Sequence, residues 1–491
     1  MSLRERYGLL LTWCLCRTAK LCCVVLLGFG LINASAVQTN RQIAYDDLPS
    51  ELSGWLKQEG VNRENFAARI ANIQRQTDER ERIGEFDHLI FFLLQSSRFT
   101  DRARIEPALS AYELVQSLSE ADRAKFLAET SEFIPPAARI PKTAKVRIND
   151  FIAALKSNRK REDERLTYFD NLLRKTISSV LNLETLLANE YTRSMRFLYR
   201  KEFASRSVKP DELAAYVASL YQTRGHSTDT QIEANFAIHE AMQVVKLSSP
   251  QAKLNKVLIV GPGLDFAPRT DLIDLFGPQS YQPFAIADSL LSLKLADESK
   301  LQIHCADIND RVIAHLQNLR RRSEVRLSIL SGVKESAAHP PKHLIAEDYR
   351  NYFLGFGKSI GAESKLDAPD QFSAHLSKAL KIRPEIVKTI NAHRLNIVTE
   401  RLADSPQFDL VVVTNVFPYF SAPELLFALT NIQSMMTDGG YLIHNELQTV
   451  PSTFVTALSL PLLQARTVMI TTDKASPLFD GVAIHQKKPR L

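Results

Sequence analysis

Two glycines and an acidic residue follow two neighbouring hydrophobic segments in the second half of the chain. Gly261 and Gly263 come directly after one apolar run, and Asp307 comes directly after the next. Glycines at such a turn let the backbone approach a ligand closely, and the helix that follows offers free N–H donors. An acid at the end of the second strand is placed to accept hydrogen bonds from two ribose hydroxyls. We therefore predict a ligand site at these three residues and at Ile308.

Each of these residues also has a purely structural interpretation. Asp307 could cap the helix that follows it, although Asn309 or Asp310 would serve equally well. The third glycine of the dinucleotide-binding fingerprint is absent, and Phe266 and Ala267 stand in that region, which counts against a pyrophosphate ligand. The combination of a G-x-G turn after one strand and an acid after the next favours the binding interpretation.

The elements that must position these residues alternate in type after residue 248. Short β-branched runs cover residues 256–260, 301–306, 409–413, 441–445, 467–471 and 481–485. Strands that alternate with helical segments predict a parallel, doubly wound sheet. The last two runs lie too close in sequence for a helical crossover, so they should form an antiparallel hairpin. The predicted fold class is α/β, a Rossmann-like sheet with a terminal antiparallel hairpin.

A helical region precedes this sheet. From about residue 46 to about residue 246, apolar residues recur at three- and four-residue spacing, which predicts an all-helical domain. We divide the chain into a leader of residues 1–36, a helical domain of residues 37–247 and a sheet domain of residues 248–491. The sequence reveals no role for the helical domain.

The first 36 residues have the parts of a secretory signal peptide. Arg4, Arg6, Arg17 and Lys20 precede an apolar stretch, and the segment ends in an A-x-A sequence. The segment predicts export or membrane anchoring, whereas a buried N-terminal helix or a start codon placed too early would be the alternatives. Four of the five cysteines also lie here, without histidine or acidic neighbours, so we predict no metal site.

Composition excludes several classes of protein. The 491 residues are 45% hydrophobic and 24% charged, as in soluble globular proteins, and unlike collagens, coiled coils, disordered chains and disulfide scaffolds. Beyond the leader, 57 Lys and Arg face 54 Asp and Glu, which leaves a formal charge of +3. That balance gives no reason to expect a nucleic-acid partner.

The most informative block covers residues 408–420, FDLVVVTNVFPYF, and is followed by the sequence DGGYLI at residues 438–443. Here the chain resembles the class I S-adenosylmethionine-dependent methyltransferases. In that family "FDLV" opens the fourth strand, "DGGYL" leads into the fifth, and an antiparallel strand pair comes last. The resemblance implies S-adenosylmethionine as the cofactor.

Four further segments resemble a bacterial group of this family, the methyltransferases that esterify glutamates of chemotaxis receptors. They read ADIN, YRNYF, HRLNIV and NVFPYF, at residues 306–309, 349–353, 393–398 and 415–420. The resemblance implies that Asp307 holds the ribose, that Asn396 and Ile397 lie beside the adenine, and that Asn415 faces the methionine end. The family's Gly-Glu-Glu-Pro run is replaced here, so one cofactor-binding acid is missing or is represented by Asp265.

The expected function is methyl transfer from S-adenosylmethionine, with a carboxylate on a protein or a small molecule as acceptor. Such an acceptor needs no base, so the protein would chiefly align and desolvate the reactants. Asn415 and Tyr419 are the predicted catalytic residues. Tyr419 is the best polar group for orienting a substrate, and its alternative is a packed aromatic ring.

Two other interpretations of the sequence assign the protein to a different functional class. The altered glycine loop also fits a catalytically inactive Rossmann-fold binding or sensor module. A nicotinamide-dependent oxidoreductase fits less well, because the third glycine is absent and a hairpin ends the sheet. The leader indicates export or membrane association through residues 1–36, whereas the supply of S-adenosylmethionine favours a catalytic domain in the cytoplasm.

Overall fold

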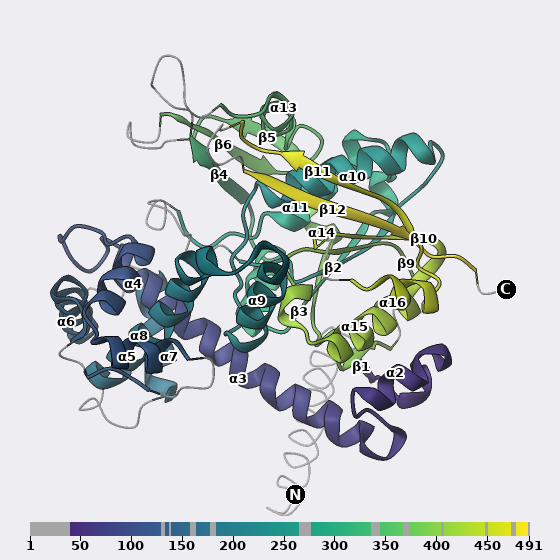
Figure 1. Ribbon diagram of the computed structural model, residues 1–491. Coiled ribbons are helices and arrows are strands. Elements are labelled where there is room, and N and C mark those ends of the chain that lie inside the picture. Colours follow the sequence, from purple (N-terminus) through teal and green to yellow (C-terminus); the bar gives the residue numbers. More distant parts are fainter. Residues whose placement is uncertain are drawn as a thin grey trace, which may run out of the picture. The chain divides into compact units, whose positions relative to one another are not determined.

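A computed structural model (Figure 1) describes residues 40–128, 133–136, 139–157, 164–176, 183–264, 276–334, 344–366, 373–403, 407–446, 450–472 and 478–489. The chain divides into two compact units, residues 1–41 with 402–404, and residues 42–401 with 405–491. The leader predicted for residues 1–36 and the acid Asp265 lie outside the described residues. The strands β1 (Asn40–Gln42) and β8 (Glu400–Leu402) span the boundary between the units.

A seven-stranded sheet forms the centre of the second unit. Its strand order is β11-β12-β10-β9-β2-β3-β7. The strands are β2 (Lys256–Val260), β3 (Gln302–Asp307), β7 (Ile390–Arg394), β9 (Phe408–Val413), β10 (Met436–His444), β11 (Leu462–Met469) and β12 (Phe479–Gln486). The pairs between β10, β9, β2, β3 and β7 are parallel, and β12 is antiparallel to both β10 and β11. The predicted Rossmann-like sheet with a terminal antiparallel hairpin is confirmed.

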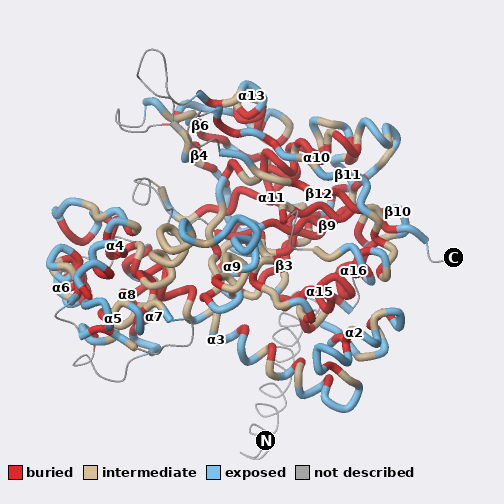
Figure 2. Tube along the Cα trace, viewed as in Figure 1, coloured by how far each residue is buried: buried red, intermediate tan, exposed pale blue. Residues whose placement is uncertain are grey.

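The central strands are apolar because both faces of the sheet are covered. In β2 and β9 almost every residue is buried, which is typical of parallel strands between two layers of helices (Figure 2). The covering helices include α10 (Ala234–Ser248), α11 (Gln282–Ser292), α12 (Asp310–Leu319) and α15 (Ala422–Met435). The chain order of the strands reverses between β2 and β9, and ligands of such sheets bind at the carboxyl ends of the strands beside this reversal.

The remaining helices and strands of the sheet domain were not predicted, and one predicted strand is longer in the structure. A separate antiparallel sheet has the order β4-β6-β5, formed by Val325–Lys334, His375–Ile382 and Gly361–Ser364. The short helices α13 (Glu347–Gly355), α14 (Pro384–Thr389) and α16 (Ser452–Ala457) complete the domain. Strand β10 begins at Met436 rather than at residue 441, because the polar residues that we interpreted as a turn form an irregularity within the strand.

The N-terminal region is helical, as predicted. It contains α2 (Ser53–Gln58), α3 (Arg63–Gln95), α4 (Pro107–Gln116), α5 (Glu120–Leu127), α6 (Lys142–Lys156), α7 (Glu164–Thr176), α8 (Leu183–Glu202) and α9 (Pro210–Thr223). None of the helices in the described ranges is long and apolar enough to cross a membrane.

The longest helix, α3, takes part in two hydrophobic cores. In its first half Phe66 packs edge-on against Phe427 of α15, with ring centroids 5.2 Å apart. In its second half Phe92 packs against Phe151 of α6 and Phe169 of α7. Because one continuous helix joins both cores, α3 carries the residues between them past the edge of the seven-stranded sheet (Figure 1).

Candidate cofactor site

The glycine turn after β2 has the conformation that the sequence predicts. Gly261 has a φ of 69° and Gly263 a φ of 74°, in the left-handed region that favours glycine. A Cβ atom on Gly263 would lie 2.8 Å from the carbonyl oxygen of Thr228, and one on Gly261 would lie 2.7 Å from Cγ2 of Val416. The Thr228 segment of the helical region therefore lies directly against the turn.

Asp307 lies at the end of β3 and is only 8% exposed. Its carboxylate accepts a hydrogen bond from the Asn309 N–H at 2.8 Å. Burial raises the pKa of Asp307 to about 6, although the N–H groups of Asn309 and Gly263 and the charge of Arg311 each lower it. Asn309, not Asp307, caps α12, because its side chain accepts from the Arg311 N–H. The carboxylate of Asp307 is therefore not taken up as the cap of α12, and the half-buried Ile308 follows it.

Glu85 of α3 binds the residues that follow Asp307. Its Oε1 accepts hydrogen bonds from Nδ2 of Asn309 at 2.7 Å and from Nη2 of Arg311 at 2.9 Å. The hydroxyl of Tyr168 also donates to Glu85. Burial alone would raise the pKa of Glu85, but Arg311 and these hydrogen bonds hold it below its ordinary value. Glu85 is therefore an ionised, buried connection between the helical region and the tip of β3.

Asn396 and Ile397, which follow β7, are both buried. Nδ2 of Asn396 donates to Oε1 of Gln74 at 3.1 Å and to Oγ1 of Thr77 at 3.2 Å, both on α3. The carbonyl oxygen of Ile397 accepts from Asn431 of α15 at 2.9 Å. The residues that the resemblance places beside the adenine are thus already hydrogen-bonded, Asn396 to the helical region.

Tyr419 is 9% exposed and contacts the helical region on several sides. Its hydroxyl oxygen accepts from the Ser227 N–H at 3.3 Å, and its carbonyl oxygen accepts from Arg80 of α3 at 3.0 Å. The rings of Tyr221 and His226 meet it edge-on. Tyr419 therefore has features of both interpretations, because its ring is packed against other aromatic rings and its hydroxyl oxygen is hydrogen-bonded within the protein.

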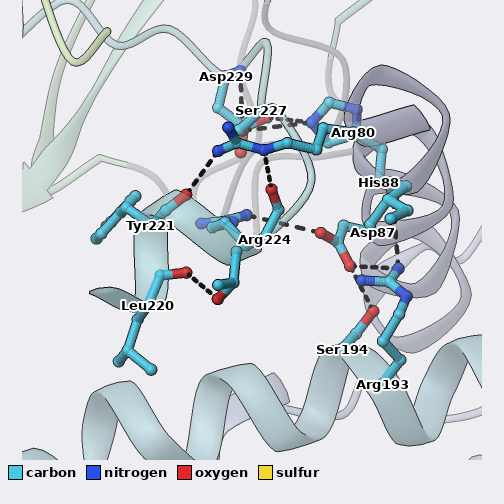
Figure 3. Close-up of polar contacts among 12 residues, drawn as sticks. Arg80, Asp87, His88, Arg193, Ser194, Leu220, Tyr221, Arg224, Ser227 and Asp229 are labelled. Atoms are coloured by element: carbon cyan, nitrogen blue, oxygen red, sulfur yellow. Dashed lines mark hydrogen bonds and ion pairs between the residues drawn. The ribbon is translucent and has the colours of Figure 1, made fainter. Parts of the chain in front are cut away.

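Buried charges hold the segment from Arg224 to Thr230 in place (Figure 3). Arg80 donates to the carbonyl oxygens of Tyr221 and Arg224, at 2.8 and 3.0 Å. Asp87, the residue of α3 two turns further on, pairs with Arg193 at 2.7 Å and lies 3.9 Å from Arg224. These contacts fix the chain that covers the glycine turn.

His88, Ser227 and Asp229 are close together, but they do not form a catalytic triad (Figure 3). Oγ of Ser227 and Oδ1 of Asp229 both approach Nε2 of His88, at 3.5 and 3.3 Å. Nη2 of Arg311 lies 3.3 Å from Nδ1, and an arginine can only donate, so Nδ1 is the acceptor and Nε2 carries the proton. In a Ser-His-Asp triad the serine is hydrogen-bonded to one ring nitrogen of the histidine and the acid to the other. His88 is thus a connecting group between α3 and α12.

A second group of polar residues lies at the carboxyl ends of β9 and β10. Asn415 is exposed, has a φ of 57°, and exchanges hydrogen bonds with Asn445 at 2.9 and 3.1 Å. The next residue, Glu446, is 9% exposed, and burial raises its pKa to about 8. Glu446 was not among the predicted site residues, although an acid just past a buried strand is the same kind of signal as Asp307.

The residues of α3 were also missed, and they share a spacing. Gln74, Thr77, Glu81, Glu85 and His88 recur every three or four positions, so they form one polar stripe along the helix. Four of them hydrogen-bond or lie against residues of the sheet domain, as described above. Glu81 lies near Arg394, Asp310 and Asp307, and burial raises its pKa to about 7. A line of polar residues at helical spacing is the signal that could have indicated a polar partner for this face of α3.

In the part of the chain that the structure describes, no group of three or more His, Cys, Asp or Glu side chains is placed to hold a metal ion. His304 stacks on His393 with their nitrogens 2.9 Å apart, and burial lowers the pKa of both to about 4. The two rings line a cleft of about 590 Å³ near the start of β3.

The predicted site residues thus lie at one edge of the sheet, after β2, β3, β7 and β9, except Asp265, which lies outside the described residues. The glycine turn and the end of β3 are neighbours, since the Gly261 N–H donates to the carbonyl oxygen of Ala306, the residue before Asp307, at 2.8 Å. Asn396 and Tyr419 contact α3 instead of one another, and Asn415 bonds with Asn445.

No family model matches the chain, and no curated protein matches it. Among solved structures, the N-methyltransferase NodS from Bradyrhizobium japonicum in complex with S-adenosyl-L-homocysteine is 13% identical, over 53% of this chain and 90% of its own, with a TM-score of 0.27. Magnesium protoporphyrin IX methyltransferase from Synechocystis, with bound S-adenosylmethionine, is 8% identical over 53% and 86%, with a TM-score of 0.26. A TehB-like S-adenosylmethionine-dependent methyltransferase from Corynebacterium glutamicum is 13% identical over 59% and 98%, with a TM-score of 0.25. None of these three is a chemotaxis-receptor methyltransferase. At such scores, any functional conclusion has to come from the strand order and the site residues themselves.

Proposed function

We propose that the protein is an S-adenosylmethionine-dependent methyltransferase. One observation supports this above the others: beside the reversal of strand order, the left-handed glycine turn after β2 is hydrogen-bonded to the end of β3, where the Gly261 N–H donates to the carbonyl oxygen of Ala306 at 2.8 Å and the buried carboxylate of Asp307 follows. This is the arrangement that nucleoside ligands of doubly wound sheets use, with the backbone close to the ligand and an acid for the ribose.

The residues present fit such a cofactor in part. Asp307 can accept from ribose hydroxyls, Asn396 and Ile397 lie one strand further for the adenine, and Asn415 lies on the other side of the turn for the methionine end. When bound, S-adenosylmethionine supplies a methyl group on a positively charged sulfur. The chain's own residues would bind and align it and exclude water, which is the main requirement of this substitution.

The polar contacts of α3 with the sheet domain limit when the cofactor can bind. Glu85 is hydrogen-bonded to Asn309 at 2.7 Å and Gln74 to Asn396 at 3.1 Å, so no ligand can lie between these partners. We infer that the cofactor enters when α3 moves away from these residues, and that the form described here is closed. A protein that is mostly closed binds its ligand more weakly, in proportion to the open fraction.

The proposed acceptor is a carboxylate of a protein or a small molecule, as the finer resemblance to the chemotaxis-receptor group implies. A methyl ester would distinguish it, because alkali releases methanol from esters and not from methylated amines. Incubation with S-[methyl-³H]adenosylmethionine and a panel of carboxylates, followed by alkali, tests this part separately from cofactor binding.

Calorimetric titration of the full chain with S-adenosylmethionine and S-adenosylhomocysteine tests the proposal itself. Asp307→Asn should weaken both ligands by about 10- to 100-fold, since a hydrogen bond to a charged group contributes about 1.5–3 kcal/mol. Asp310→Asn is the matched control, because Asp310 is exposed and follows closely after Asp307 in the sequence. Equal affinity in Asp307→Asn and the control would exclude this site.

A second candidate function, an inactive binding module, is favoured by one observation. Asn396 and Tyr419 already have partners in the helical region, so the closed form could be the functional one. Cofactor binding with no transfer to any acceptor of the panel would support this alternative.

A further inference from the structure

Glu446 is a buried carboxyl group to which no side chain of the described residues forms a hydrogen bond. Both of its carboxyl oxygens are shielded from solvent, and neither forms a hydrogen bond of good geometry within the described residues. No lysine or arginine of those residues forms an ion pair with it. A buried charge without a partner is very costly, so such a group either keeps its proton or receives a partner from outside.

The position of Glu446 is close to the predicted ligand. It follows β10, and the N–H groups of Asn415 and Val416, which follow β9, lie near enough to lower its pKa. Val416 in turn touches the glycine turn, since its Cγ2 would lie 2.7 Å from a Cβ on Gly261. The ends of β2, β9 and β10 therefore meet here, beside the reversal of strand order where ligands bind.

Two histidines beside Glu446 supply no positive charge. Nδ1 of His485 lies 2.9 Å from the carbonyl oxygen of Leu460, so this nitrogen carries the proton. Nε2 of His485 then accepts from Nε2 of His444 at 3.1 Å, which leaves Nδ1 of His444 as an acceptor, 3.9 Å from Oε2 of Glu446. Burial lowers the pKa of His444 to about 3 and also lowers that of His485, so both rings are neutral.

The remaining charged neighbour is an acid. Asp480 of β12 raises the pKa of Glu446 further, beyond the effect of burial, and its own pKa is raised to about 6 by burial. Among the residues that the structure describes, every titratable group facing Glu446 is thus negative or neutral. With no ligand the carboxyl keeps its proton at neutral pH, and an approaching cation would make its ionised form favourable.

We propose that Glu446 is the anionic partner of the positively charged sulfur of S-adenosylmethionine, and that it distinguishes this cofactor from the neutral product S-adenosylhomocysteine. The inference rests on the proposed function. The two ligands share the adenosine and the amino-acid groups and differ in one methyl group and one positive charge. Binding of the charged ligand ionises Glu446, and the released proton passes to the buffer.

Proton release gives a test that needs no methyl acceptor. The full chain is titrated with each ligand at pH 7 in two buffers of different ionisation enthalpy, which yields the number of protons exchanged. S-adenosylmethionine should release up to about 0.9 proton, the protonated fraction of a group with a pKa near 8, and S-adenosylhomocysteine should release almost none. The release should fall as the pH is raised through 8.

Glu446→Gln keeps the shape of the side chain and removes the charge. It should abolish the difference in proton release and lower the preference for S-adenosylmethionine by about tenfold. Glu385→Gln, at an exposed position of α14, is the control and should behave as the wild type. Equal proton release by both ligands in the wild type, or an unchanged preference in Glu446→Gln, would overturn the inference while cofactor binding stands. Binding of neither ligand to the wild type or to Gln74→Ala, which removes the hydrogen bond between α3 and Asn396, would overturn the proposed function and this inference with it.

Discussion

The replacement of Gln74 by alanine tests whether α3 closes the cofactor site. Oε1 of Gln74 accepts from Nδ2 of Asn396 and from Oγ1 of Thr399, both at 3.1 Å, and these hydrogen bonds join α3 to the chain after β7. Glutamine and alanine both favour helix, so α3 itself should keep its structure. Asn396 also keeps its second partner, Thr77. The change therefore weakens the closed form selectively.

The expected change in cofactor affinity follows from the two hydrogen bonds that the substitution removes. A hydrogen bond between neutral groups contributes about 0.5–1.5 kcal/mol net, so the closed form loses about 1–3 kcal/mol. If cofactor binding requires opening and the closed form predominates, that energy appears in the affinity. The dissociation constant for S-adenosylmethionine should then fall by about 5- to 150-fold.

Calorimetric titration of the wild type, Gln74→Ala and Gln76→Ala measures this directly. Gln76 is a matched control, because it lies on the same helix and is exposed. Tighter binding in Gln74→Ala alone is the expected result. If Gln74→Ala binds the cofactor more weakly than the control, α3 contributes to the bound form instead of blocking it, and the reasoning about closure is refuted. Equal affinity in the two variants would refute it as well.

Two further predictions concern stability. Gly84→Ala should lower the melting temperature by several degrees, because a Cβ there would lie 1.8 Å from the carbonyl oxygen of His226, whereas Gly54→Ala, with open space around it, should not; equal melting temperatures would contradict this close approach. Since the pKa of Glu446 is raised from about 4.5 to about 8, the folded protein binds more protons than the unfolded chain between these values, and the wild type should lose stability relative to Glu446→Gln as the pH rises from 4.5 to 8. Urea unfolding at pH 5, 6.5 and 8 checks this, and a constant difference between the two proteins would contradict it.

The sheet was largely predictable because its central strands satisfy a simple rule. Strands buried on both faces are continuous apolar runs, and β2 and β9 have that character in the sequence. The edge strand β7 was missed because its sequence, INAHR, is mostly polar and only its first residue is fully buried. The separate sheet β4-β6-β5 was missed because we did not divide residues 325–389 into elements.

The site was predictable only where residues follow strands directly. Gly261, Gly263 and Asp307 could be selected because parallel strands bring their carboxyl ends to one edge. The contacts of Glu85 with Asn309 and Arg311 join residues more than 220 positions apart, and no local pattern indicates which helix meets which strand. The position of α3 depends on tertiary packing at both of its ends.

The polar character of the stripe on α3 bears on how the protein could work. If α3 met the sheet domain through apolar side chains instead, separating the two would expose hydrocarbon to water, at its full cost in free energy. The contacts made by Gln74, Glu81 and Glu85 are hydrogen bonds and charge contacts, which water or the hydroxyl and ring nitrogen atoms of a nucleoside can replace. Phe66 and Phe92 still hold the two ends of the helix in their hydrophobic cores. A helix anchored by apolar residues at its ends and joined to the site by exchangeable polar ones between them is suited to release its site residues without unfolding, and the Gln74 and Gln76 variants measure whether it does.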